Sequence, residues 1–415
     1  MTDLQARLDD LADRGLYRRM RLVSGPQGPR VVLDGKPVLL LCSNNYLGLA
    51  DHPRVREAAA EAAMRWGVGA GASRLVSGTM TVHRRLEERL AAFKGTESAL
   101  LFGSGYLANV GVISALAGSG RTVFSDELNH ASIVDGCRLA RAQTVVYRHG
   151  DVEHLAWCVG RAGGRGGVVV TDSVFSMDGD VAPLAEIVEL ARGAELRVVV
   201  DEAHGTGCVG PGGRGAVAEA GLEGEVDVVI GTLGKALGAY GAFAACSSTM
   251  AAFLTNCARS LIFSTALPPP AVAGAMAALE LLEEQPRRVE KLQANAGTLR
   301  DELAREGFDV SGSTTQIVPL VVGAADVAMA ICEAALERGV FAQAIRPPTV
   351  PEGTSRLRLA VMASHTKGEL REAARSLGRA ALQAGFRPAD AMPVAASQST
   401  DEWEAVPPPE AARAA

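Results

Sequence analysis

The chain has 415 residues, of which 48% are hydrophobic, and this length favours a large domain accompanied by a smaller one. Its formal net charge is -6 and it has no block of Lys or Arg, so neither a nucleic-acid partner nor a membrane patch is expected. The seven cysteines are scattered without a C-x-x-C pair, which indicates neither a zinc site nor a disulfide framework. Small molecules are therefore the expected partners.

The N-terminal residues 1–21 mix Asp and Arg in an amphipathic pattern and lack the apolar core of a signal peptide. No stretch of the chain approaches the roughly 18 uninterrupted apolar residues of a membrane span. We therefore expect a cytoplasmic protein with no membrane association, in which residues 1–45 form an N-terminal segment ahead of the first domain.

Short runs rich in β-branched residues alternate with longer Ala-rich stretches, and this alternation predicts a parallel sheet covered by helices. The runs that predict strands are residues 98–102, 144–147, 167–171, 196–201 and 226–231. The apolar runs at 168–170 and 198–200 are continuous, as is typical of strands that are buried on both faces. The sequence thus predicts a large α/β domain over residues 46–270.

Three prolines at 268–270 precede a long helical pattern, residues 271–307, which we expect to connect the large domain to a smaller one. This smaller α/β domain should extend over residues 271–387. Its predicted strands are residues 315–322, 340–345 and 356–360. From residue 388 to 415 the chain consists largely of Ala, Pro, Glu and Ser, which predicts a disordered tail.

Four motifs follow predicted strands, and ligands of open parallel sheets bind at the carboxyl ends of the strands. The first, Gly103-Ser104-Gly105-Tyr106, opens a helical stretch whose free N–H groups would suit a phosphate. An isolated Gly-x-Gly is more often a simple turn. The second motif contains His130, and a single histidine is more often a structural hydrogen-bonding group than a catalytic one.

The third motif places Asp201 at the end of a buried run, followed by Glu-Ala-His-Gly. A buried carboxylate needs a positive partner, and a protonated pyridine nitrogen is one. The alternative is that Asp201 is a helix cap or a member of an ordinary ion pair.

The fourth motif, Gly-Thr-Leu-Gly-Lys-Ala-Leu-Gly at residues 231–238, contains Lys235. A buried lysine can lose its proton and act as nucleophile or base. A nucleotide-binding P-loop is excluded because Ala236 follows the lysine.

Together the four motifs supply a phosphate cradle, a histidine for a ring face, a carboxylate for a ring nitrogen and an amine for an aldehyde. These groups are the ones that a pyridoxal 5′-phosphate site requires. The sequence therefore predicts this cofactor, and it predicts no metal site.

From about residue 39 to residue 365 the sequence resembles the α-oxoamine synthases, a pyridoxal-phosphate family of fold type I. The segments that carry the resemblance are residues 43–49, 73–78, 129–132, 172–179, 201–205 and 232–235. The resemblance implies a fold type I transferase with a large domain built on a mostly parallel, seven-stranded sheet and a smaller C-terminal α/β domain. It also implies a homodimer with active sites at the subunit interface.

The resemblance implies a role for each matched residue around the cofactor. Lys235 would form the Schiff base, Asp201 would pair with the pyridinium nitrogen, and His130 would stack on the ring and assist decarboxylation. The further cofactor contacts that it implies are Gly105 and Tyr106 near the phosphate, Ser176, His204 at the ring hydroxyl, and Thr232 at the phosphate.

For the substrates, the resemblance implies that Arg358 binds the carboxylate of the amino acid and that Asn44 is a further substrate-binding residue. Arg346 and Thr349, within an Arg-Pro-Pro-Thr segment, are expected on the acyl side, with an ordinary surface arginine as the alternative for Arg346. The resemblance also implies a substrate-binding arginine within residues 16–19. Arg18 is the expected N-terminal residue, with Arg19 as the alternative.

The Arg-Pro-Pro segment resembles the biotin-pathway member of the family. The implied reaction is a decarboxylative condensation of L-alanine with a pimeloyl thioester, and it releases CO2. Either CoA or a carrier protein would carry the pimeloyl group. One alternative is a sister member that uses glycine with acetyl-CoA or succinyl-CoA. A nicotinamide dehydrogenase would need G-x-G-x-x-G after residue 102, but Gly103-Ser104-Gly105 is followed by Tyr106, Leu107 and Ala108, so the third glycine is missing. A catalytically inactive relative is disfavoured because both Asp201 and Lys235 are present.

Overall fold

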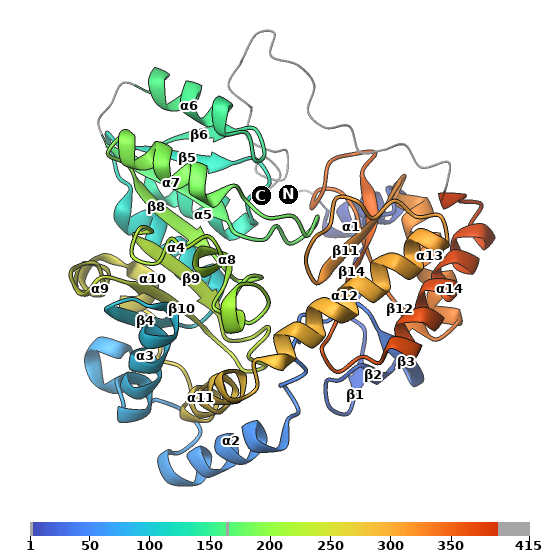
Figure 1. Cartoon of the computed structure of the whole chain (residues 1–415), viewed down its shortest axis with the longest axis horizontal. Helices are drawn as coiled ribbons and strands as arrows, with labels where there is room; N and C mark the ends of the chain where they lie inside the picture. The colour runs from blue at the N-terminus through green and yellow to red at the C-terminus, as the bar shows by residue number, and fades with distance from the viewer. Residues whose placement is uncertain (1–2, 163–165, 389–415) are drawn as a thin grey trace.

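The computed structural model describes residues 3–162 and 166–388, and its largest sheet has seven strands (Figure 1). In spatial order they are β4 (Ser98–Phe102), β10 (Ala242–Cys246), β9 (Val228–Thr232), β8 (Arg197–Asp201), β7 (Gly167–Asp172), β5 (Thr122–Asp126) and β6 (Gln143–Tyr147). Neighbouring strands from β9 to β6 are parallel, whereas β10 runs antiparallel to both β4 and β9. The predicted fold class, with a mostly parallel seven-stranded sheet, is confirmed.

The continuous apolar runs of the central strands are explained by helices on both faces of this sheet (Figure 1). Along β7, Val169 belongs to one apolar cluster, whereas Val168 and Val170 belong to another, because successive side chains point to opposite faces. The helices of this lobe are α3 (Thr81–Lys94), α4 (Gly105–Leu116), α5 (Ala131–Ala140), α6 (Val152–Arg161), α7 (Leu184–Gly193), α8 (Ala216–Glu219), α9 (Ser248–Cys257) and α10 (Arg259–Ile262).

The second lobe contains two small sheets, and one of them includes strands from the N-terminal segment. The antiparallel sheet has the order β11 (Ile317–Gly323), β14 (Ser355–Ala360) and β13 (Gln343–Ile345). The other has the order β1 (Val23–Ser24), β2 (Arg30–Leu33), β3 (Lys36–Leu40) and β12 (Val340–Phe341). The single strand predicted at residues 340–345 is therefore wrong in detail, since β12 and β13 join different sheets. The division of the chain near residues 45 and 270 stays a prediction.

Two helices, rather than the single predicted pattern, connect the lobes. Helix α11 (Pro269–Glu284) packs against α2 (Pro53–Trp66), and α12 (Arg287–Arg305) packs against α14 (Lys367–Gln383). The break falls at Pro286, which lacks the N–H that a continuous helix would need. Helix α13 (Ala325–Glu337) completes the second lobe beside α14.

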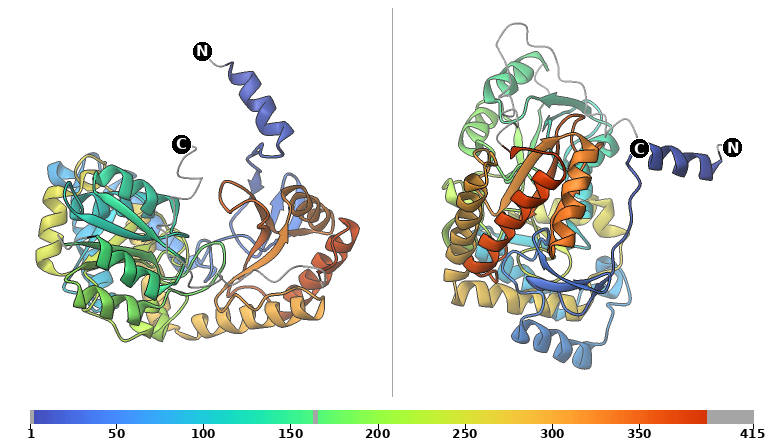
Figure 2. Two further views of the ribbon diagram at one scale, coloured as in Figure 1. Left: turned by 90° about the horizontal axis from the view of Figure 1, so that it is seen from above. Right: turned by 90° about the vertical axis from the view of Figure 1, so that its right-hand side faces the viewer.

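The first helix, α1 (Leu4–Asp13), buries none of its residues and projects from the body of the molecule (Figure 2). No helix in the described part of the chain combines the length and the apolar character that crossing a bilayer requires. Apart from Pro388, the tail predicted for residues 388–415 lies outside the described residues.

Candidate active site

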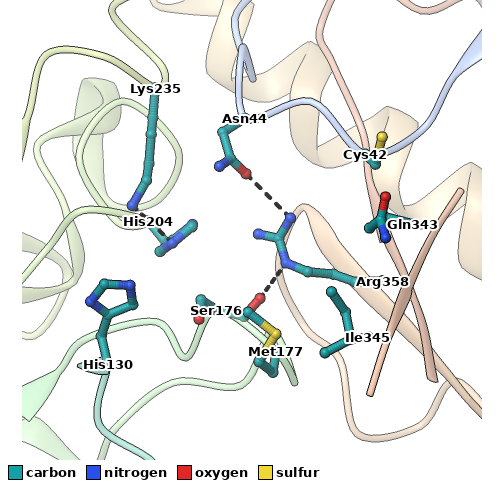
Figure 3. Close-up of a pocket in the computed structure, with 10 residues that line it drawn as sticks. All are labelled: Cys42, Asn44, His130, Ser176, Met177, His204, Lys235, Gln343, Ile345 and Arg358. Atoms are coloured by element: carbon teal, nitrogen blue, oxygen red, sulfur yellow. Dashed lines mark hydrogen bonds between the residues drawn. The ribbon is translucent and has the colours of Figure 1, made fainter. Parts of the chain in front are cut away.

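A cavity of about 220 Å³ lies between the two lobes, at the carboxyl edge of the large sheet (Figure 3). Its lining residues are Cys42, Asn44, His130, Ser176, Met177, His204, Lys235, Gln343, Ile345 and Arg358. Six of these were predicted as site residues from widely separated motifs: Asn44, His130, Ser176, His204, Lys235 and Arg358. The fold thus brings residues from the N-terminal segment, the large sheet and β14 to one place.

Lys235 stands in a tight loop directly after β9. The loop is closed by hydrogen bonds from the N–H of Leu233 to the Gly241 carbonyl (2.9 Å) and from the N–H of Gly238 to the Lys235 carbonyl (2.9 Å). Gly238 has a φ of +61°, and a Cβ there would lie 2.4 Å from the Ala50 nitrogen, so only glycine fits. The glycine therefore fixes the direction in which the loop presents the lysine.

The Lys235 amine lies 2.9 Å from Nε2 of His204 and forms no ion pair with any described carboxylate. Burial lowers the pKa of Lys235 below its usual range, although the charges of Asp201 and Asp172 act in the opposite direction. A lysine amine that is more easily deprotonated is a better nucleophile and a better base.

Behind His204, the hydroxyl of Tyr46 lies at the centre of a buried network. The hydroxyl donates to Oδ1 of Asn44 (3.0 Å) and lies 2.6 Å from Nδ1 of His204. Because the Tyr46 proton is directed to Asn44, the His204 ring donates from Nδ1 and leaves Nε2 as the acceptor that faces Lys235. This tautomer is neutral, as expected since burial lowers the pKa of His204 well below its usual value.

Arg358 completes this network from β14. Its Nη2 donates to the Tyr46 hydroxyl (3.2 Å), its Nη1 donates to Oδ1 of Asn44 (3.2 Å), and its Nε donates to the Ser176 carbonyl. The guanidinium is buried and faces the cavity, yet it forms no ion pair with any described carboxylate (Figure 3). A buried cation without a counter-ion is a suitable receptor for a substrate carboxylate.

His130 is connected to Asp201 through two further side chains. Nδ2 of Asn109 donates to Oδ2 of Asp201 (2.6 Å) and to the Ser132 hydroxyl (2.9 Å), which lies 2.7 Å from Nδ1 of His130. The N–H of Ser132 also points to Nδ1, so this nitrogen is an acceptor and the ring proton resides on Nε2. Burial lowers the pKa of His130, which favours the neutral ring.

Asp201 provides the test of whether the site fits the predicted cofactor. Its carboxylate is buried at the end of β8, accepts from the N–H of Ala203 (2.7 Å) and makes no ion pair within the described ranges. Asp172 pairs with Asp201 in the strand register, and burial together with the Asp201 charge raises the pKa of Asp172 well above its usual range. A protonated pyridine nitrogen would be the positively charged partner that the Asp201 carboxylate lacks, so these residues fit pyridoxal phosphate.

The residues predicted for the phosphate do not line the cavity. Gly105 is the first residue of α4, whose N-cap is Ser104, and Thr232 ends β9 with its hydroxyl donating to the Gly241 carbonyl (3.2 Å). The Tyr106 hydroxyl donates to Oδ2 of Asp135 (2.6 Å) and is half exposed. Phosphate binding by Gly105, Tyr106 and Thr232 stays a prediction.

The residues predicted for the acyl chain also lie outside the cavity lining. Arg346 directly follows Ile345, which does line the cavity, and its Nη1 donates to the Gly15 carbonyl. Burial and the positive charge of Arg18 lower the pKa of Arg346. Arg18 and Thr349 are exposed, as is Arg19.

Three residues of these networks carried no predicted role: Tyr46, Asn109 and Ser132. Tyr46 stands inside the matched segment 43–49, and a fully buried tyrosine needs a partner for its hydroxyl. Asn109 and Ser132 lie on α4 and α5, which pack closely together. Ser132 stands inside the matched segment 129–132, whereas Asn109 stands in none of the matched segments. The contact between the two side chains depends on which helices meet, and no local pattern shows that.

Comparison with known proteins places this geometry in a family. Residues 36–377 match the model of the aminotransferase class I and II family. An 8-amino-7-oxononanoate synthase of Citrifermentans bemidjiense is 55% identical over 370 residues, which are 88% of this chain and 95% of the relative. A protein of the same name in Geobacter sulfurreducens is 52% identical over 91% of this chain and 98% of the relative.

Among solved structures, a serine palmitoyltransferase from S. paucimobilis with a bound PLP–myriocin aldimine superposes with a TM-score of 0.88. It is 35% identical, and the match covers 92% of this chain and 97% of that one. Both the fold and the cofactor predicted from the sequence are confirmed by these relatives. The chain therefore belongs to the aminotransferase class I and II family, and within it to the pyridoxal-phosphate-dependent α-oxoamine synthases.

Proposed function

We propose that this enzyme condenses L-alanine with a pimeloyl thioester to give 8-amino-7-oxononanoate, with release of the thiol carrier and CO2, in biotin biosynthesis. The observation that carries the proposal is the identity of 52–55% to 8-amino-7-oxononanoate synthases along nearly their full length. The arrangement of Lys235, Asp201 and Arg358 supports the same chemistry. The sister reactions with glycine have no comparable support.

Bound pyridoxal phosphate supplies an aldehyde that carries the amino acid and a ring that accepts electron density from the α-carbon. The Lys235 amine, with its lowered pKa, removes the α-proton and holds it on Nζ beside Nε2 of His204. Asp201 would hold the ring nitrogen and, through its negative charge, would favour the protonated form of that nitrogen.

Arg358 would bind the alanine carboxylate and thereby orient the α-hydrogen toward Lys235. The carbonyl of Ser176 and the oxygens of Asn44 and Tyr46 hold the guanidinium from three sides, so that its orientation is set before substrate arrives. His130 would cover one ring face, and its Nε2 proton is available for hydrogen bonds during loss of CO2. Gly105, Tyr106 and Thr232 would hold the phosphate.

The acyl chain would extend past Gln343 and Ile345 toward Arg346. The positive charge of Arg18 contributes to the lowered pKa of Arg346, so the two guanidinium groups lie near one another. Two cations beyond this part of the lining suit the far carboxylate of a dicarboxylic acyl chain, and Thr349 would add a hydroxyl to the same rim.

We further propose that the enzyme is a cytoplasmic homodimer. Val76 and Phe263 are 79% and 69% exposed, and the bridge between Ser73 and Thr265 places their two segments side by side. Exposed apolar residues that gather on one surface favour association with another protein surface. A second copy of the chain is the occupant that the family relationship supports.

The proposed reaction is tested by incubating the holoenzyme with L-alanine or glycine and with pimeloyl-CoA, heptanoyl-CoA, acetyl-CoA or succinyl-CoA. We expect 8-amino-7-oxononanoate from alanine and pimeloyl-CoA, with kcat/KM at least tenfold above every other pair. Mass spectrometry identifies the product, and a parallel assay with a pimeloyl carrier protein determines which carrier is used. Faster turnover of glycine with a short acyl-CoA would contradict the proposal.

A further inference from the structure

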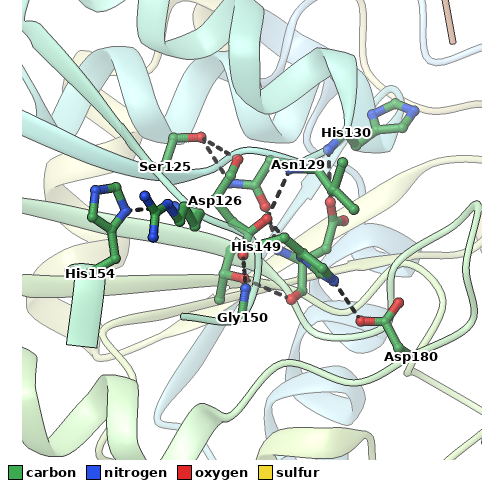
Figure 4. Close-up of polar contacts among 12 residues, drawn as sticks. Ser125, Asp126, Asn129, His130, His149, Gly150, His154 and Asp180 are labelled. Carbon is green, nitrogen blue, oxygen red and sulfur yellow. Dashed lines mark hydrogen bonds and ion pairs between the residues drawn. The ribbon is translucent and has the colours of Figure 1, made fainter. Parts of the chain in front are cut away.

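Away from the cavity, His149 stands between two carboxylates in the connection from β6 to α6 (Figure 4). Its Nδ1 lies 2.9 Å from Oδ1 of Asp126 and its Nε2 lies 2.8 Å from Oδ2 of Asp180. The ring packs edge-on against Phe175, with 4.3 Å between the ring centroids. None of these contacts takes part in the chemistry described above.

Two ionised carboxylates can only accept hydrogen bonds, so both ring nitrogens of His149 must carry protons and the ring must be an imidazolium. Burial opposes this charge, but the hydrogen bonds and charges of Asp126 and Asp180 outweigh it and raise the pKa of His149 to about 10. Glu127 is a further charged group near the ring, since the charge of His149 acts on the pKa of Glu127 together with that of Arg148. His149 therefore remains a cation throughout the neutral range.

Asp180 closes a hairpin that carries Ser176 at its tip. The N–H of Phe175 donates to the Asp180 carbonyl (3.0 Å), the N–H of Gly179 donates to the Phe175 carbonyl (2.8 Å), and Val174 bridges Val181. From the other lobe, Arg358 donates to the Ser176 carbonyl, and Arg356 forms an ion pair with Asp178. The hairpin, residues 174–181, thus links His149 to the guanidinium that faces the cavity.

Asp126 extends the same connection toward His130. It accepts hydrogen bonds from the N–H groups of Leu128 and Gly150, both at 2.9 Å, and so fixes the turn between β5 and α5 (Figure 4). His130 follows directly and begins α5 as its N-cap. One imidazolium therefore ties together the two loops that carry Ser176 and His130.

We propose that His149 is a positioning residue: it clamps the hairpin 174–181 to the β5–α5 turn and thereby holds Arg358 in the orientation that receives the amino-acid carboxylate. The part that concerns amino-acid binding rests on the proposed function. The clamp itself does not depend on the identity of the substrates.

The test compares the holoenzyme with His149→Gln, which removes the charge and cannot serve both carboxylates with the geometry of the ring. Hydrogen exchange followed by mass spectrometry should show at least tenfold faster exchange in peptides that contain Phe175 and Gly179, with no change in β9. The dissociation constant for L-alanine, read from the cofactor absorption, should rise at least tenfold, whereas the KM for pimeloyl-CoA should change less than twofold.

Two further variants distinguish the clamp from a general loss of structure. His52→Gln, at the start of α2, is the matched control and should leave the hairpin exchange unchanged. Adding Asp180→Asn to His149→Gln removes one of the two unpaired carboxylates, so part of the hairpin protection should return. Equal acceleration of exchange in β9 and the hairpin, or unchanged hairpin exchange, would overturn the proposed clamp. The clamp and its effect on substrate binding can fail separately. Faster hairpin exchange with an unchanged dissociation constant for L-alanine would refute only the link to Arg358.

The clamp also has a pH signature. A folded pKa of about 10 lies above the usual histidine value of about 6.5, so the stabilisation by His149 is complete below about pH 6.5, declines progressively above it and is lost as the pH rises through about 10. The difference in melting temperature between the native chain and His149→Gln should therefore narrow from pH 6.5 to pH 10. A constant difference over this range would contradict the charged clamp.

Discussion

At the scale of single residues, the buried carboxylate of Asp201 leads to a direct prediction. Replacing it by Asn keeps the hydrogen bond to the Ala203 N–H but removes the charge that, in the proposed mechanism, would hold a proton on the cofactor ring. Exchange of the α-proton of L-alanine for deuterium, followed by NMR without an acyl donor, should slow on the order of 100-fold or more. Cofactor binding should persist, and an unchanged exchange rate would mean that Asp201 is structural.

The sequence predicted the residues that stand in short, distinctive motifs, and it missed those whose role depends on tertiary neighbours. Lys235 and His204 stand beside glycines at strand ends, where chemistry is expected. Tyr46 and His149 contact side chains that are distant in the sequence, His204 in the case of Tyr46 and Asp180 in the case of His149. A local sequence pattern does not predict which loops will meet at the edge of a sheet.

At the scale of elements, the predicted strands correspond to β4, β6, β7, β8 and β9, within about two residues. The two strands of the large sheet that were not predicted are β5 and β10. Strand β10 reads Ala-Phe-Ala-Ala-Cys, and alanine is depleted in strands, so burial between β4 and β9 rather than intrinsic preference makes it extended.

Helix α3 and the turn after β8 are joined by a buried ion pair between Lys94 and Glu202, both almost inaccessible to solvent. Lys94→Met should destabilise the protein by about 3–5 kcal/mol, because it leaves an unpaired buried carboxylate directly beside Asp201. Urea denaturation gives the free energy of unfolding, with the exposed Lys291→Met as the matched control. The double variant with Glu202→Gln should recover part of the loss; a cost below about 1 kcal/mol for Lys94→Met would contradict a structural role for the pair.

At the scale of the whole molecule, the sequence predicted two α/β units but not how the N-terminal segment is used. Strand β3 pairs with β12 in parallel, so residues about 300 positions apart share one sheet. The cavity depends on this arrangement, because Cys42 and Asn44 follow β3 directly. A pairing of such distant, short strands leaves no periodic pattern in the sequence, and it is therefore invisible to local analysis.

The proposed homodimer gives a prediction for the whole molecule, based on Val76 in the π-helix η1 (Arg74–Gly78). A glutamate at this position should oppose association strongly, since in a two-fold interface the unpaired charge is introduced twice. We expect Val76→Glu to raise the dimer dissociation constant on the order of 100-fold, which corresponds to about 2.7 kcal/mol. Analytical ultracentrifugation over a range of concentrations measures this constant. Leu382→Glu, which changes a similarly exposed side chain on α14 in the other lobe, is the matched control and should remain dimeric. If both variants associate like the native chain, the surface around Val76 and Phe263 does not form the dimer interface.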